Sequence, residues 1–118
     1  MLLSEKDARS ITDKILSLIK ADDATVGVSS DKLSHLRFAG NNILTSGQRE
    51  SRAANVTVWI GGKRGSSSTS DWDEASLKAM VAEAEKIARL APVDREYLPT
   101  LGKQVYKPSN RFVAATAN

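Results

Sequence analysis

Side chains that could form a catalytic or metal centre are scarce in this 118-residue sequence. A zinc hydrolase site needs about three protein ligands, and usually at least two of them are histidines. The chain has one histidine, His35, and no cysteine. A Ser-His-Asp triad is also disfavoured, because His35 falls within an alternating stretch beside Arg37 and no G-x-S-x-G motif is present. We therefore predict no catalytic residue, no metal ligand and no cofactor-binding residue within the chain.

The stretch GGKRGS, residues 61–66, combines glycines with two basic residues, as loops that hold phosphate do. A Walker A loop requires G-x-x-x-x-G-K-[ST], but here Arg64 follows Lys63, and Thr57 stands where the first glycine belongs. The GxxG loop of KH domains clamps nucleic acid between two helices, whereas this stretch follows a strand. Two glycines between strands are typical of a hairpin turn with positive φ, which is the interpretation we favour.

The formal net charge is +3, and the basic excess is concentrated in the central segment. Residues 31–64 contain six Lys or Arg against two Asp or Glu. Such a sheet surface attracts nucleic acid or an acidic partner, although solvated charges also protect sheet edges. Double-stranded-RNA-binding domains share an α-β-β-β-α order, yet the last helix here begins with the acidic stretch SDWDEAS, which would repel phosphate. A small basic nucleic-acid-binding domain is therefore kept as the alternative function.

The sequence of the first half of the chain predicts one helix and two strands. These elements must position the candidate residues discussed above. Ser4 with Asp7 is typical of a capped helix start, and apolar residues then recur at helical spacing through residues 5–20. Two alternating stretches follow, ATVGVSS and LSHLRFAG, and each predicts a strand. In the second strand, Leu36 and Phe38 share one face. The GNN that comes next predicts a turn.

The second half predicts, in order, a weak strand, a stronger strand, a turn and a short strand, at residues 43–46, 55–60, 61–65 and 66–70. Ser70 or Asp71 is expected to cap a second helix, whose apolar stripe continues until Pro92 ends it. The predicted fold class is α+β. An antiparallel sheet of four to five strands is covered on one face by two helices, in the order α-β-β-β-β(-β)-α.

Residues 1–92 are predicted to form the domain. Residues 93–118 are predicted to be a linker or the start of a following domain, because Pro99, Gly102 and Pro108 interrupt every periodic pattern. No window approaches the roughly 18 consecutive apolar residues that a membrane span needs. The absence of cysteine suits a reducing compartment. We expect a cytoplasmic protein with no membrane partner.

One long stretch carries a family resemblance. The segment LRFAGNNILTSGQRESRAANVTVWIGGKRGSSSTSDWDEASLKAMVAEAEKIARLAP is similar to the N-terminal domain of the TldD/PmbA family, also labelled modulators of DNA gyrase. The matching features are the LRFA-NN turn, the ESR before the next strand, the V-V-GG-RGS-ST-D passage and the helix end A-IARLAP. The resemblance covers roughly residues 4–92. It departs from the family at Asn55, where the SR-x-x-G pattern has a glycine.

The resemblance implies a two-domain, zinc-dependent peptidase that works as a dimer or heterodimer, with roles in peptide maturation and antitoxin degradation. The family's HExxxH metal motif lies in the second part of the family's chain. This sequence contains no residue that corresponds to that motif. The resemblance therefore implies a non-catalytic N-terminal domain, with zinc bound elsewhere and no activity for this chain alone. The implied partners are a C-terminal peptidase domain, a homologous subunit and a peptide substrate, while nucleic acid is disfavoured.

The contact mode we expect is an extended peptide or a partner subunit lying against the sheet face or adding to an edge strand. Trp59 is a candidate because its side chain is expected on the sheet face opposite to that of Val58. The tail around Val105 and Tyr106 could instead cover it. The full set of candidate contact residues, with the basic ones placed on the outer face or at the hairpin turn, is Arg37, Arg49, Arg52, Trp59, Lys63 and Arg64.

Overall fold

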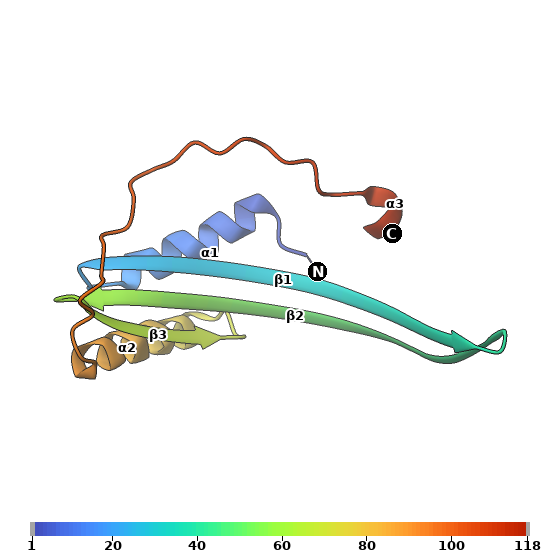
Figure 1. Cartoon of the computed structure of the whole chain (residues 1–118), viewed down its shortest axis with the longest axis horizontal. Helices are drawn as coiled ribbons and strands as arrows, with labels where there is room; N and C mark the ends of the chain where they lie inside the picture. Colours follow the sequence, from blue (N-terminus) through green and yellow to red (C-terminus); the bar gives the residue numbers. More distant parts are fainter. Residues whose placement is uncertain (1, 118) are drawn as a thin grey trace.

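A computed structural model describes residues 2–117 of the chain. Three antiparallel strands form one sheet in the order β1-β2-β3, and two helices pack on one face of it (Figure 1). The α+β class and the antiparallel sheet are therefore confirmed. The elements, in chain order, are α1 (Glu5–Leu18), β1 (Asp23–Ala39), β2 (Asn42–Ile60), β3 (Lys63–Thr69), α2 (Glu74–Leu90) and α3 (Ala114–Ala117).

The prediction of four to five strands is wrong, because the described residues form three. The two strands expected before the GNN turn are one continuous strand, β1, and the weak and strong strands after it are both part of β2. The polar segments that suggested breaks pair with each other instead. Lys32 lies opposite Glu50, with 3.8 Å between Nζ and Oε1, and Arg49 reaches Asp31 at 3.8 Å. Opposite charges on neighbouring strands support pairing, so the ladder continues through them.

Both hairpins turn through residues with positive φ. Gly40 and Asn41 have φ of 55° and 62°, and Gly61 and Gly62 have φ of 57° and 72°. Two such residues between antiparallel strands form the tight turn that matches strand twist. The hairpin-turn interpretation of the Gly-rich stretch is confirmed, but the turn is shorter than predicted, because β3 already begins at Lys63.

The core lies between the sheet and the two helices. Ala54, Val56 and Val58 of β2 are fully buried against Ile15 of α1 and against an apolar stripe of α2. That stripe consists of Leu77, Met80, Val81, Ala84 and Ala88. Gly65 of β3 allows the closest approach, since a Cβ there would lie 2.0 Å from the carbonyl oxygen of Ala84.

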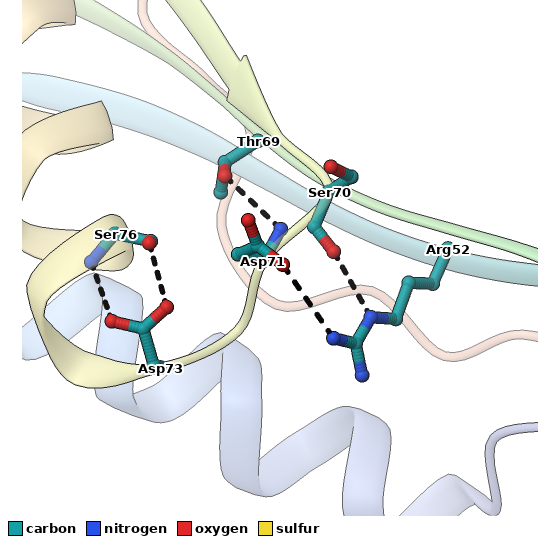
Figure 2. Close-up of polar contacts among 6 residues, drawn as sticks. All are labelled: Arg52, Thr69, Ser70, Asp71, Asp73 and Ser76. Carbon is teal, nitrogen blue, oxygen red and sulfur yellow. Dashed lines mark hydrogen bonds and ion pairs between the residues drawn. The ribbon is translucent and has the colours of Figure 1, made fainter.

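The start of α2 differs from the prediction. Asp73 caps the helix by accepting a hydrogen bond from the backbone N–H of Ser76 at 3.0 Å (Figure 2). Ser70 and Asp71, the expected caps, lie in the connection before the helix. Arg52 holds them there, with Nε donating to the Ser70 carbonyl at 3.0 Å and the guanidinium 3.7 Å from the Asp71 carboxylate. The first helix does begin after Ser4, as predicted, and ends at Leu18.

The far half of the β1–β2 hairpin projects beyond both helices (Figure 1). We call residues 31–51 the hairpin arm; all of them are exposed except Gly47, which is half-buried. The radius of gyration is 18.7 Å, with extents of 60 × 32 × 30 Å. A compact domain of this length would have a radius of gyration of about 13–14 Å. The arm is therefore an extension outside the packed layers, and its residues are largely exposed.

The chain after α2 remains attached to the sheet over residues 93–100, which we call the strap. Val93 forms an isolated bridge with Lys63, and the N–H of Asp94 donates to the Gly62 carbonyl at 2.8 Å. Tyr97 then stacks on Trp59, with 5.7 Å between the ring centroids. The tail does cover Trp59, but through Tyr97 instead of Val105 and Tyr106, whose side chains are 98% and 84% exposed.

Candidate partner-contact surface

The face of the sheet opposite the helices, which we call the open face, is polar. Because side chains alternate along a strand, residues that neighbour the buried Val56 and Val58 point to this face. Trp59 lies here, opposite Asp23 of β1 and Arg64 of β3. Thr57 and Ser66 pair across strands, with 2.9 Å between their hydroxyl oxygens. The open face thus offers hydroxyl groups, one aromatic ring and cations to a partner.

Four of the six predicted contact residues lie on the open face, but they form two separate groups. Trp59 and Arg64 are cross-strand neighbours close to the β2–β3 turn. Arg37 and Arg49 lie on the hairpin arm, opposite Thr45 and Leu33 respectively. Ten residues separate Arg49 from Trp59 along β2, which is about 33 Å of extended strand. The two groups would contact different parts of a large partner or of an extended one.

Arg52 is not on the outer face, where the sequence placed it. The alternation that buries Ala54, Val56 and Val58 continues to Arg52, so its side chain points to the helix side. Its guanidinium carbon lies 5.2 Å from the centre of the Trp72 ring, and it also pairs with Asp71 (Figure 2). Counting every second residue back from the valines would have shown this from the sequence.

Lys63 also lies on the helix side, opposite Ile60 of β2. Its Nζ donates to the carbonyl oxygen of Arg89 at 3.3 Å, close to the end of α2. A cation at a helix C-terminus interacts favourably with the helix dipole. The contacts of Arg52 and Lys63 therefore stabilise the fold, which leaves Arg64 as the cation of the β2–β3 turn that faces outward.

A polar cluster around Asp23 was not predicted. The Asp23 carboxylate accepts hydrogen bonds from the Tyr97 hydroxyl at 2.9 Å, the Thr100 N–H at 2.8 Å and the Thr100 hydroxyl at 2.5 Å. The two Thr100 hydrogen bonds are the main cause that lowers the pKa of Asp23 from 3.8 to about 2. The hydrogen bond to Asp23 in turn raises the pKa of Tyr97. More than 70 residues separate these partners, so no local pattern could indicate the cluster.

The residues present do not fit a zinc centre. No group of three or more His, Cys, Asp or Glu side chains comes together within residues 2–117 in a way that could hold a metal ion. His35 is exposed on the hairpin arm, and its ring packs over Gly47 of the neighbouring strand. Across the same residues, none of the helices has the length and apolar character needed to cross a membrane.

Comparisons with known proteins identify the family of this chain. The fold and its residues define a small α+β domain whose described part lacks a metal-ligand cluster. A family model described as PmbA/TldA metallopeptidase domain 1 matches residues 24–88, more than half of the chain. The chain therefore belongs to the PmbA/TldD family, in the region of its first domain.

A solved structure extends this comparison to the three-dimensional fold. TldE from Thermococcus kodakarensis matches with a TM-score of 0.64 and 18% sequence identity. The match covers 91% of this chain and 23% of the TldE chain, so this chain spans about a quarter of that protein. At this identity the likeness shows the fold alone. A search of curated proteins returned no match.

Proposed function

We propose that this chain acts as the non-catalytic N-terminal domain of a TldD/PmbA-type zinc metallopeptidase subunit. The observation that carries the proposal is the family match over residues 24–88 in a chain whose described residues contain no metal-ligand cluster. The zinc and the peptide-bond chemistry then belong to another domain, and this chain alone has no peptidase activity. Its contribution is to subunit assembly and to the access of peptides in a cytoplasmic enzyme.

The partners of this domain are a C-terminal peptidase domain, a homologous subunit and a peptide substrate. Residues 1–92 form the domain and residues 93–118 lead into the next one. The open face supports a contact role, because the two described helices of the core pack on the other face. Arg64 is exposed there beside Trp59, whose ring is partly covered by Tyr97 of the strap. Trp and Arg side chains are enriched among the residues that dominate binding energy at protein interfaces.

The arrangement of charges does not favour the nucleic-acid alternative. Arg37, Arg49 and Arg64 lie on the open face, whereas Arg52 and Lys63 lie on the helix side and contact the protein itself. Phosphate binding draws on several cations that act together along one surface. The basic residues of the central segment are instead divided between two faces, and some are neutralised by neighbouring carboxylates.

Binding of this chain to the separately produced remainder of the peptidase subunit tests the proposal. We expect Arg64→Glu and Trp59→Ala each to weaken that binding about tenfold, as the loss of an interface anchor does. Lys86→Glu makes the same charge change on the exposed outer side of α2 and should leave the affinity unchanged. Equal affinities for all three variants, measured by titration calorimetry, would exclude the open face as the contact surface.

A further inference from the structure

The hairpin arm exposes both apolar side chains and a strand edge. Five large apolar residues of the arm are at least half exposed: Leu33 (50%), Leu36 (57%), Phe38 (72%), Ile43 (69%) and Leu44 (54%). β1 is an edge strand of the sheet, and among the described residues no strand pairs with its outer side. Long edges with apolar side chains are templates for pairing with another chain. The arm therefore has the features of an interaction surface.

We propose that the outer edge of β1 pairs antiparallel with the same edge of a second copy of this chain, centred on Ser34. A two-fold axis perpendicular to the sheet relates the two copies, so the contact is self-complementary. The pairing joins residues 29–39 of one copy to residues 39–29 of the other. This pairing specifies a contact for the assembly role proposed above, and it rests on that proposed function. Its test, however, needs only this chain.

Charge selects this register. Centring on Ser34 places Arg37 opposite Asp31 of the second copy, and the symmetry makes this pair twice. Arg37 makes no ion pair with any described residue of its own chain, while Asp31 already lies 3.8 Å from Arg49. Registers centred on Asp31, Lys32 or Arg37 would instead place like charges directly opposite each other, which is destabilising.

The same register brings the apolar tip of the arm to a cavity that both apolar and charged side chains line. Phe38 falls opposite Ser30 of the second copy, and both residues are on the helix side of the sheet. Ser30 accepts a hydrogen bond from the N–H of Leu3 at 2.8 Å. Leu3 in turn lines a cavity of about 530 Å³ together with Ile11 and Trp72. The Phe38 ring, 72% exposed in a single copy, would thus be covered beside Leu3.

A disulfide at the two-fold axis tests the pairing directly. The chain contains no cysteine, so Ser34→Cys introduces the sole thiol, at an exposed position that the fold tolerates. In the proposed register, the introduced cysteine of one copy lies directly opposite that of the other, and the distance between paired residues of antiparallel strands is one that a disulfide spans. Gln48→Cys is the matched control, because Gln48 is the cross-strand neighbour of Ser34 and is also exposed, but lies one strand away from the edge.

We expect Ser34→Cys to form a covalent dimer on mild oxidation while Gln48→Cys remains monomeric. Cross-linking of Gln48→Cys to the same extent, or none in Ser34→Cys, overturns the proposal. Sedimentation of the cysteine-free chain should show twice the 12.7 kDa mass at high concentration, and a monomer throughout also overturns it. If this chain does not bind the separately produced remainder of the peptidase subunit, the proposed function is contradicted instead. The failure of the dimer and the failure of the proposed function are therefore distinguishable.

Two further variants test the side chains. Arg37→Asp should raise the dissociation constant of the dimer about tenfold, because two ion pairs become repulsive. Adding Asp31→Arg to that variant should recover most of the loss. Phe38→Ser, at an exposed position, should weaken the dimer at least tenfold through lost apolar burial. Dissociation constants unchanged in both Arg37→Asp and Phe38→Ser would contradict this interface.

Discussion

Asp23 shows how one carboxylate connects distant parts of the chain. It stands at the start of β1, yet its hydrogen-bond donors include Tyr97 and Thr100 of the strap. Asp23 is only half-buried, so these hydrogen bonds compete with water, and their effect is therefore seen most clearly in the pH dependence. The strap in turn brings Tyr97 onto Trp59, the aromatic residue of the open face. Asp23 thus helps to hold the strap residue that covers Trp59, together with the backbone contacts of Val93 and Asp94.

Release of the strap in acid is the first prediction. The pKa of Asp23 is lowered from 3.8 to about 2 in the folded chain, so protonation favours the released state. The contribution of Asp23 is complete above about pH 4 and is lost as the pH falls towards 2. The fluorescence of Trp59, recorded in a Trp72→Phe background, should report the change. Asp23→Asn should remove this acid transition, and an identical transition in that variant would exclude Asp23 as its cause.

Gly65 gives the second prediction at this scale. A Cβ at this position would lie 2.0 Å from the Ala84 carbonyl oxygen and 2.5 Å from the Ala88 nitrogen, and neither backbone atom moves easily. We expect Gly65→Ala to destabilise the fold by about 3 kcal/mol, as overpacking of a closely packed interface does. Gly102→Ala is the control, since no atom of the described residues would lie within 4 Å of a Cβ added there. Urea unfolding of both variants measures the difference, and equal midpoints would contradict the close approach.

The strap is the clearest prediction at the scale of elements. Removing residues 102–118 should leave the melting temperature unchanged, because residues 102–116 are all exposed. Removing residues 93–118 also deletes the Tyr97–Trp59 stack, whose loss costs about 0.5–1.5 kcal/mol. That corresponds to a decrease of about 3–8 °C for a domain of this size. Equal melting temperatures for the two truncations would show that the strap does not stabilise the sheet.

The elements also show how far the sequence could be interpreted. The two helices, both glycine turns and the buried faces of Val56 and Val58 follow from periodicity and turn chemistry. The number of strands could not be predicted in this way. Lys32 and Glu50 are typical of loops, and only the structure shows that they lie opposite each other on paired strands. For the same reason Arg52 was assigned to the outer face, although its place in the alternation with Val56 and Val58 pointed inward. The contacts of Asp23 lie beyond local patterns altogether.

At the scale of the whole molecule, charge and shape argue for protein partners. The arm extends past the packed layers, and it carries large apolar side chains that are at least half exposed. Arg49 of the arm is separated by about 33 Å of extended strand from Trp59, the cross-strand neighbour of Arg64. A large or extended protein partner could contact both groups, whereas a short ligand could not.

The prediction at this scale is that the chain does not bind nucleic acid measurably. Since the basic residues are divided between two faces, we expect no measurable affinity for duplex DNA or RNA at about 0.15 M salt. Fluorescence anisotropy with labelled duplexes over a range of salt concentrations measures this. A submicromolar affinity that falls steeply with salt would support the nucleic-acid alternative.

The intact mass of the native polypeptide that carries these residues tests the central claim most directly. If this chain is the first domain of a metallopeptidase subunit, the native mass should be several-fold above 12.7 kDa. The HExxxH metal motif should then follow in the same polypeptide. A native mass close to 12.7 kDa would contradict the account, because no peptidase domain would then be joined to this one.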